Sequence, residues 1–366
     1  MTVEFVGMIG TRDVSETRGP QGPPIDPAYV RRFARAHEEA GFDRILIGYG
    51  SSTPEGTQVA AYAAARTSTL GLLIAHRPGF VFPTTAARTF ATLDQLSGGR
   101  VAVHTITGGS DAEQRRDGDY LGKDDRYART EEYLGILRRA WSSPEPFSHT
   151  GRFYRFEDFA LLAQPAHRIP LYFGGSSPAA YRTGGAVADV YALWGEPLRE
   201  TAEQIAAVQA SAAAAGRGPL GISVSFRPIL AATDELAWAR AERILATIEA
   251  SSGGKGSFTG DQTRVLGGPT PENVGSQRLL AAAAKGDRHD RALWTAPARA
   301  SGAQGNSTAL VGSPETVARA LLDYVDLGVS TILIRGYDPV DDAVDYGRHL
   351  IPLVKQELVH RSLVSA

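Results

Sequence analysis

The sequence predicts an α/β fold, and within that class a (β/α)8 barrel. Short β-rich apolar runs alternate with longer helical patterns along the 366 residues, which is typical of a parallel sheet covered by helices. Eight such runs favour closure of the sheet into a barrel. An open doubly wound sheet is the alternative, but it normally carries a GxGxxG fingerprint after its first strand. Ile9-Gly10-Thr11-Arg12 stands there instead.

The strands are expected where β-branched and other apolar residues cluster between turn residues. These runs are 3–8, 44–47, 70–75, 101–105, 171–173, 190–193, 222–229 and 331–334. The first helix begins after Asp26, a capping residue followed by Pro27, and ends near Gly41. Further helices are expected at about 57–66, 84–96, 127–141, 234–250, 314–327 and 341–357, with one more behind each of the fifth and sixth strands. We interpret 234–250 as the seventh barrel helix.

The composition excludes several classes of protein. Hydrophobic residues make up 43% of the chain, enough for a large core, and a formal net charge of -2 gives no electrostatic case for binding nucleic acid or an anionic membrane. The chain contains no cysteine, so disulfides and thiolate chemistry are excluded. No stretch of about 18 apolar residues predicts a membrane span, and the eight histidines form no metal-binding pattern. A cytoplasmic enzyme without a metal is the expectation.

We expect a single domain over residues 1–366, with two insertions. A polar segment at 112–125 follows the fourth strand. A longer segment at 251–306 precedes the eighth strand and is rich in glycine. A long loop of this kind is typical of a lid or a binding loop, so we interpret it as a mobile lid. A plain surface insertion is the alternative.

Glycines and hydroxyl residues recur where strands end. Gly174-Gly175-Ser176-Ser177 follows the fifth strand and opens a helix. Backbone N–H groups and the helix dipole favour an anion at such a place, so Gly175, Ser176 and Ser177 are predicted to hold the phosphate of a cofactor. A simple serine N-cap is the alternative.

Several segments, taken in their order, resemble the bacterial luciferase-like flavin monooxygenases, and within them the FMNH2-dependent alkanesulfonate monooxygenases. The resemblance covers nearly the whole chain. It is carried by Ala75-His76-Arg77-Pro78-Gly79, the stretch 87–100, Thr107-Gly108-Gly109, Asp125-Arg126-Tyr127, Tyr172-Phe173-Gly174-Gly175-Ser176-Ser177, Leu193-Trp194-Gly195-Glu196-Pro197, Thr308-Ala309-Leu310-Val311-Gly312 and Gly336-Tyr337.

The resemblance implies a two-component system. A separate NAD(P)H:flavin reductase supplies FMNH2, and this protein uses it with O2 to oxygenate a small molecule. It also implies a homodimer or homotetramer. Two other functions remain open: an F420-dependent oxidoreductase on the same barrel, and a flavin-binding protein without catalysis.

The resemblance also implies cofactor contacts. Thr107 and His104 belong to the fourth strand, where many relatives carry Asn at the position of His104. Only one of His104 and Thr105 can face into the barrel; His104 is a flavin contact or a structural histidine. Ala75 is small enough to lie against a flavin ring, or is ordinary core. Arg126 and Tyr127 match positions that touch the flavin nucleotide, although Arg126 also suits an exposed helix start.

The catalytic residues are expected at the barrel rim. Tyr337 matches a tyrosine that the alkanesulfonate enzymes keep at the active site, where a phenol donates a proton or hydrogen bond. Trp194 ends the sixth strand, as a site residue or as a core aromatic. Thr53 replaces a cysteine of the family and either faces the site or stabilises a turn.

The substrate pocket departs from the family in its basic residues. Ser225 and Arg227 stand where the alkanesulfonate enzymes carry Arg and His, Pro339 and Arg12 each replace a histidine, and Arg299 is the nearest candidate for the lid arginine. An unpaired buried arginine is costly, so Arg227, with Arg12 and Arg299, predicts a small anionic, possibly organosulfur, substrate. A structural ion pair between Arg227 and Glu196 is the alternative.

Overall fold

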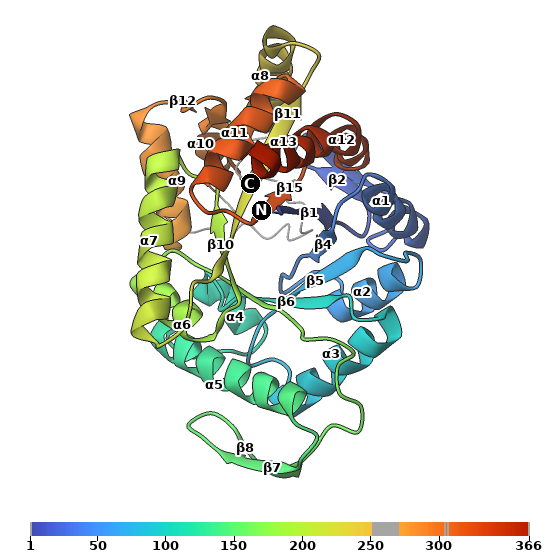
Figure 1. Ribbon diagram of the computed structural model, residues 1–366, viewed down its shortest axis with the longest axis vertical. Coiled ribbons are helices and arrows are strands. Elements are labelled where there is room, and N and C mark those ends of the chain that lie inside the picture. Colours follow the sequence, from blue (N-terminus) through green and yellow to red (C-terminus); the bar gives the residue numbers. More distant parts are fainter. Residues whose placement is uncertain (1, 251–270, 304, 306, 365–366) are drawn as a thin grey trace.

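The computed structural model describes residues 2–250, 271–303, 305 and 307–364, and at its centre is a closed barrel of parallel strands (Figure 1). The strands are β1 (Glu4–Ile9), β4 (Arg44–Ile47), β5 (Gly71–His76), β6 (Val101–Thr105), β9 (Leu171–Gly174), β10 (Val190–Trp194), β11 (Gly221–Leu230) and β15 (Thr331–Ile334). They pair in the order β10, β9, β6, β5, β4, β1, β15, β11, and β10 pairs with β11 to close the ring. The predicted barrel is confirmed, with each strand within one residue of its expected ends.

The interior of the barrel is filled by a layer of side chains from seven strands. The layer consists of Val6, Leu73, Ala102 and Tyr172, with Leu46, Val190 and Leu333 packed against them. Because successive side chains of a strand point to opposite faces, the residues two positions further along these strands also face inward. Those positions lie nearer the C-terminal ends of the strands, where barrel enzymes build their sites.

The helices lie outside the strands. They are α1 (Pro27–Glu39), α2 (Gly56–Ala64), α3 (Pro83–Ser97), α5 (Lys123–Ser142), α6 (Pro178–Val187), α7 (Leu198–Ala214), α11 (Pro314–Asp326) and a C-terminal run of α12 (Pro339–Asp345), the π-helix η1 (Tyr346–Leu350) and α13 (Ile351–Val364). As predicted, Asp26 caps α1 by accepting hydrogen bonds from the N–H groups of Ala28 and Tyr29. The apolar faces of these helices pack against the outward side chains of the strands and form the main core.

The prediction that residues 234–250 form the seventh barrel helix is wrong. Helix α8 (Asp234–Ala250) does not cover the barrel as its seventh helix. Its buried Ala237 and Ala241 pack in a separate small core with Trp294 and Val311. Helix α11 takes the barrel position, since it packs against both β11 and α13. An amphipathic pattern shows that a helix buries one face, but not which partner covers it.

The segment before β15 contains regular structure in its described part. It includes α9 (Val274–Lys285), β12 (Arg288–His289), β13 (Leu293–Trp294), α10 (Ala296–Ser301) and β14 (Ala309–Gly312). The first half of β11 pairs with β10 and β15 in the barrel, and its second half continues past the rim to pair with β14. Of the predicted lid at 251–306, residues 251–270, 304 and 306 lie outside the described residues. The lid function stays a prediction.

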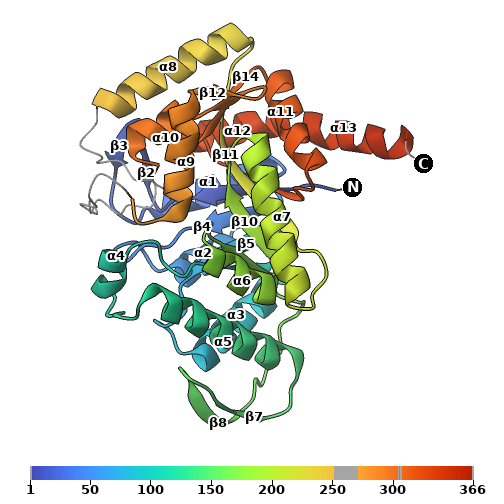
Figure 2. The same cartoon turned by 90° about the vertical axis from the view of Figure 1, so that its left-hand side faces the viewer.

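Three further elements depart from simple strand–helix alternation. A hairpin of β2 (Asp13–Ser15) and β3 (Arg18–Gln21) follows β1, and α4 (Asp111–Arg116) follows β6. Figure 2 shows β2, β3, α4 and α10 at one end of the barrel, with both chain termini at the other. A second hairpin, β7 (Phe147–Thr150) and β8 (Arg155–Phe159), projects beyond α5 (Figure 1).

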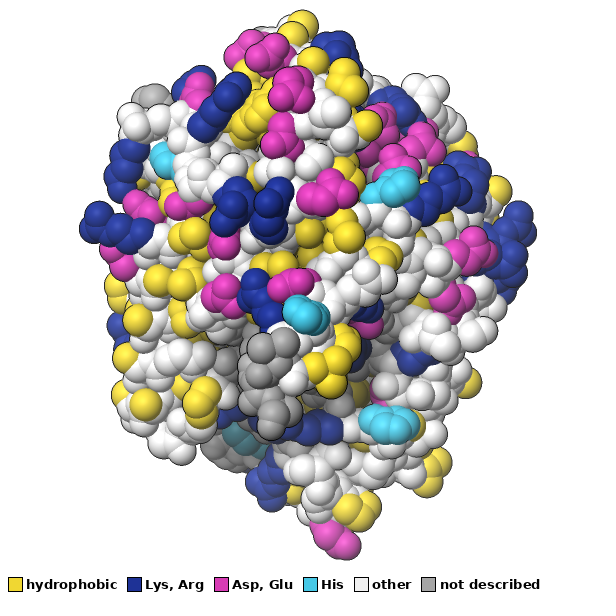
Figure 3. Space-filling model, turned by 45° about the horizontal axis from the view of Figure 1, so that its top comes forward, with side chains coloured by type: hydrophobic (Ala, Val, Ile, Leu, Met, Phe, Trp, Pro, Cys, Tyr) yellow, Lys and Arg dark blue, Asp and Glu magenta, His cyan; other side chains and the backbone are white. Residues whose placement is uncertain are grey.

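One face of the molecule shows no single dominant charge (Figure 3). Figure 3 shows a face on which basic and acidic side chains are intermingled, in keeping with the formal net charge of -2. Within the described part of the chain, no helix has the length and apolar character needed to cross a membrane.

Candidate active site

Every barrel strand brings a predicted site residue to the C-terminal rim or the loop behind it. Around the ring from β6 to β5 these are His104 and Thr107, then Gly175, Ser176 and Ser177, Trp194, Arg227, Tyr337, Arg12, Thr53 and Ala75. This is the face where barrel enzymes place their active sites. The remaining candidates come from helices: Arg126 and Tyr127 from α5, and Arg299 from α10.

The turn between β9 and α6 has the shape of an anion cradle. Gly175 has a φ of 144°, a left-handed conformation, and a Cβ there would lie 2.7 Å from the Cβ of Ala180. The hydroxyl of Ser177 accepts a hydrogen bond from the N–H of Ala180 at 3.1 Å and so caps α6. The phenol of Tyr127 lies 3.4 Å from the same hydroxyl. The N-cap is therefore real, and it sits within a cluster of hydroxyls at a helix N-terminus.

His104 faces into the barrel and Thr105 faces out. In the register of the sheet His104 lies beside Ala75 on one side and Tyr172 on the other, and a Cβ on Gly174 would lie 3.5 Å from its ring. Its Nδ1 is buried and has no hydrogen-bond partner among the described residues. Burial lowers the pKa of His104 to about 4, so the ring is neutral at physiological pH.

Thr107 is buried at the end of the same strand, and its hydroxyl also finds no partner in the described part of the protein. Buried polar atoms are normally hydrogen-bonded. The Nδ1 of His104 and the hydroxyl of Thr107 are therefore available to a ligand.

Arg126 is buried, but its guanidinium is already engaged. It donates to the carboxylate of Asp111 at 2.8 Å and to the backbone carbonyl of Leu121 at 2.7 Å. Thr53 is engaged too, since its hydroxyl accepts from the N–H of Gly50 and donates to the carbonyl of the same residue. Its role in a turn is thus observed, and its predicted catalytic role stays a prediction.

Trp194 lies against helix α9 of the segment before β15. Gly275, in the first turn of α9, approaches its ring so closely that a Cβ would lie 2.9 Å from two ring carbons. Next along the chain, the carboxylate of Glu196 pairs with Arg278 of α9 at 2.6 and 2.8 Å. Burial raises the pKa of Glu196, against the lowering effect of Arg278. The insertion therefore closes over the β10 side of the rim.

Arg227 has a different partner from either one expected. Its two terminal nitrogens hold the carboxylate of Glu16, each at 2.8 Å, so the alternative pairing with Glu196 is wrong. Glu16 lies in the turn of the β2–β3 hairpin. A second guanidinium, that of Arg335, donates to the same carboxylate at 2.9 Å. Burial alone would raise the pKa of Glu16, but the two arginines lower it to about 2.

Tyr337 lies directly beneath Arg227, with the guanidinium 3.6 Å from the ring centroid. Its hydroxyl is buried and without a hydrogen-bond partner among the described residues. Burial raises the pKa of Tyr337, so the phenol stays protonated. The structure thus brings together Arg227 and Tyr337, two of the predicted site residues.

The other two predicted substrate arginines lie apart from this cluster. Arg12 occupies the loop after β1 and is partly exposed. Arg299 is 54% exposed on α10, where it forms an ion pair with Asp287. Arg299 is therefore directed to a partner within the insertion, and nothing in its contacts supports its predicted role as a lid arginine.

Sequence reasoning missed two features of the rim. Glu16 carried no signal, because a lone glutamate in a polar loop reads as solvated surface. Arg77 is buried, pairs with Glu113 of α4 at 3.1 Å and lies 4.5 Å from the ring centroid of Tyr49. Arg77 directly follows an apolar strand, and a charged residue in such a place is rarely buried without a partner, so the sequence did contain a signal for it.

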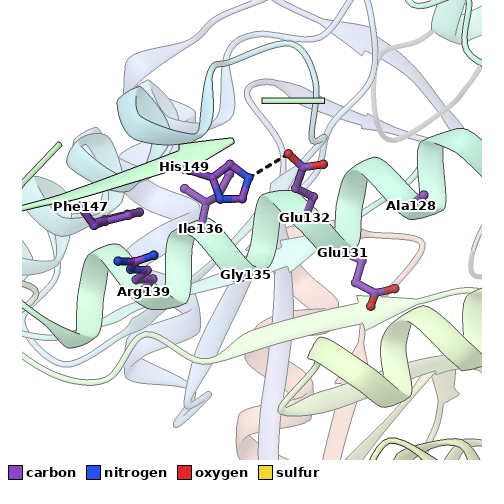
Figure 4. Close-up of a pocket in the computed structure, with 8 residues that line it drawn as sticks. All are labelled: Ala128, Glu131, Glu132, Gly135, Ile136, Arg139, Phe147 and His149. Atoms are coloured by element: carbon purple, nitrogen blue, oxygen red, sulfur yellow. Dashed lines mark hydrogen bonds and ion pairs between the residues drawn. The ribbon is translucent and has the colours of Figure 1, made fainter. Parts of the chain in front are cut away.

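An open groove of about 530 Å³ lies elsewhere, on the outer side of α5 (Figure 4). His149 of β7 bonds Glu132 there at 3.0 Å, and Glu132 also accepts from the N–H groups of Phe153 and Tyr154. These contacts fasten the β7–β8 hairpin to the barrel. The groove is separate from the rim and contains none of the predicted site residues.

Comparison with known proteins identifies the family of the chain. The model of the luciferase-like monooxygenase family matches residues 4–331. The chain belongs to this family. As a luciferase-like monooxygenase it is an oxidoreductase by class, and the expected membership is confirmed at that level.

Solved structures similar to this luciferase-like monooxygenase share its fold at low sequence identity. A riboflavin lyase solved with modified FMN and riboflavin matches with a TM-score of 0.80 at 21% identity, covering 98% of this chain and 92% of that one. The EDTA monooxygenase of Chelativorans sp. BNC1 matches with a TM-score of 0.76 at 18% identity, over 98% and 94%. An F420-dependent secondary alcohol dehydrogenase matches with a TM-score of 0.68 at 18% identity, over 97% and 99%.

The residues at the rim fit a flavin nucleotide. The cradle at Gly175, Ser176 and Ser177 suits a phosphate, and the inward face of β6 leaves the Nδ1 of His104 unpartnered. Gly174 and Ala75, on either side, carry little or no side chain, so a flat ring system has access to that face of the luciferase-like monooxygenase.

Proposed function

We propose that the protein is an FMNH2-dependent monooxygenase, the oxygenating component of a two-component system with a separate NAD(P)H:flavin reductase. The observation that carries the proposal is the hydroxyl-lined cradle at the N-terminus of α6, one strand away from the unpartnered, neutral His104. A phosphate at the cradle and a ring beside His104 require a ligand with an anionic end and a flat polar end. FMN has both.

In this proposal the residues divide the work. Gly175, Ser176, Ser177 and Tyr127 bind the phosphate, and Ala75, His104 and Thr107 contact the ring. Reduced FMN, when bound, supplies the electrons that activate O2.

The covering elements complete the site. Helix α9 on Trp194 limits the access of water from the β10 side. The buried phenol of Tyr337, behind the end of β15, keeps its proton and serves as a hydrogen-bond donor.

Anaerobic titration with FMNH2 and with reduced F420, followed by mixing with oxygenated buffer, tests this function. We expect tight binding of FMNH2, and oxidation kinetics that differ from those of free flavin and depend on added substrate. The Gly175→Ala variant should bind FMNH2 less tightly, because its new Cβ meets Ala180. Preferential binding of F420, or oxidation identical to that of free flavin, would contradict the proposal.

A small anionic, possibly organosulfur, substrate is the finer expectation from the sequence. It depends on the ability of Arg227 to receive an anion. The oxidation experiment is therefore run with matched charged and uncharged compounds: sulfonates and carboxylates against sulfones and thioethers. The pairing of Arg227 with Glu16 bears directly on the outcome.

A further inference from the structure

An internal carboxylate occupies the position where an acidic substrate group is expected. Arg227 and Arg335 project inward from neighbouring strands at matching positions, one residue after the paired Phe226 and Ile334. Between them lies Glu16, whose Oε1 accepts from both guanidiniums and whose Oε2 accepts from Arg227. Both terminal nitrogens of Arg227 are thus committed to one carboxylate, in the forked arrangement that arginine otherwise uses for ligands.

The backbone adds to this arrangement. Nη2 of Arg227 also donates to the carbonyl of Gly336 at 2.9 Å, and the hydroxyl of Thr17 donates to the carbonyl of Tyr337 at 3.3 Å. The guanidinium of Arg227 is held from below by the ring of Tyr337. Only 2% of the Arg227 side chain and 18% of the Glu16 side chain are exposed. The pair is therefore a built and largely desolvated unit.

Two neighbouring sets of ion pairs lie at this part of the rim. In the first, Glu16 pairs with Arg227 and Arg335. In the second, Arg18 and Arg240 pair with Asp13, Asp338 and Asp342. An anion that approached Arg227 would lie beside the Glu16 carboxylate, and two like charges at a largely desolvated place repel each other.

We propose that Glu16 is a specificity-determining residue that keeps acidic groups off Arg227 and Arg335, so that this wall of the site accepts uncharged substrates. The proposal rests on the proposed function for the word substrate. It replaces the sulfonate or carboxylate expected from the sequence with a neutral compound, such as a sulfone or a thioether.

The test measures anion binding without flavin or oxygen. Methanesulfonate and acetate are titrated into the wild-type protein and into the Glu16→Gln variant, with calorimetry and thermal unfolding as readouts and sodium chloride as the ionic-strength control. We expect no saturable binding to the wild type. The variant, which keeps the shape of Glu16 without its charge, should bind methanesulfonate at least about tenfold more tightly.

Two further variants make the test specific. Asp13→Asn removes a charge from the same hairpin but faces Arg18, so it should leave anion binding as weak as in the wild type. Glu16→Gln combined with Arg227→Met should lose the gained binding. If Glu16→Gln does not fold, Glu16→Ala offers a cavity that acetate can fill, and stabilisation of that variant by acetate but not chloride is the expected result.

Saturable binding of methanesulfonate to the wild-type protein, beyond the effect of sodium chloride, would overturn the proposal without any variant. So would a folded Glu16→Gln protein that binds no better than the wild type. Because neither measurement uses flavin, failure of the FMNH2 experiment leaves this result intact, and the reverse also holds.

Discussion

At the scale of single residues, the pairing of Glu16 with Arg227 places two charges in a largely desolvated part of the rim. A buried ion pair adds little net stability, but removal of one partner strands the other charge. Because Arg335 still pairs with Glu16, we expect Arg227→Met to lower the free energy of unfolding by less than the roughly 3 to 5 kcal/mol typical of a buried charge left without any partner. The double variant with Glu16→Gln should be less destabilised than Arg227→Met alone. Urea unfolding of the four proteins of this cycle measures the coupling, and strictly additive effects would contradict it.

The glycine of the phosphate cradle gives a second prediction at this scale. Gly175→Ala forces a Cβ into a left-handed backbone position, 2.7 Å from the Cβ of Ala180. We expect a loss of about 1 kcal/mol or more of stability, together with weaker FMN binding. Gly218→Ala is the control, since a Cβ there meets nothing within 4 Å and its φ is not in the positive range. Equal effects of the two substitutions on FMN affinity would remove the cradle from the cofactor site.

At the scale of elements, α9 is held to the barrel by side chains rather than by a shared sheet. Its main polar attachment is the pairing of Arg278 with the buried Glu196. We expect Arg278→Ala to raise amide hydrogen exchange in 274–285 while exchange in β5 and β6 stays unchanged. Lys285→Ala, which removes an exposed pair with Glu200, should have little effect. Unchanged exchange in α9 of Arg278→Ala would show that packing on Trp194 alone holds the helix.

Most elements could be predicted because their signals are local. Apolar β-rich runs located all eight barrel strands, and Asp26-Pro27 located the start of α1. The partner of α8 could not be predicted, because the same amphipathic pattern suits the barrel and the small core around Trp294. Glu16 and Arg227 are 211 positions apart. No periodicity or spacing connects residues so distant, so the sequence predicted Arg227 as an anion site and left out the carboxylate that fills it.

The same limit applies to the cofactor side of the site. The Gly175, Ser176 and Ser177 cradle follows from a strand end, two glycines and a helix start, all within one local pattern. The pairing of Arg126 with Asp111 depends on how α4 folds back onto α5. Its expected phosphate contact has therefore to compete with a partner that only the tertiary structure supplies.

At the scale of the whole molecule, buried histidines make stability depend on pH. Burial lowers the pKa of His37 and of His76 to about 4, from an ordinary value of 6.5. Below pH 6.5 the unfolded chain takes up protons that the folded chain refuses until about pH 4. The free energy of unfolding should therefore decrease as the pH is lowered from 6.5 to about 4. The decrease should be up to about 1.4 kcal/mol per pH unit for each such histidine.

Chemical denaturation between pH 7 and pH 4.5 measures this slope. Glu16 does not contribute in that range, because its pKa of about 2 lies below its ordinary 4.5 and its contribution is lost only below pH 4.5. His76→Gln should make the slope shallower, whereas His360→Gln, at an exposed position, should not. An unchanged slope in His76→Gln would place the source of the pH dependence elsewhere.

The ten-residue strand β11 belongs to two sheets at once, since its first half closes the barrel and its second half carries β14. A single continuous strand thus connects the barrel to the smaller sheet. Strand β14 is hydrogen-bonded to β11, β13 to β14 and β12 to β13, so the three strands are attached to the barrel through β11. Arg227 lies at the point where β11 leaves the barrel. A displacement of the outer sheet would therefore act on β11 beside Arg227, at the wall of the candidate active site.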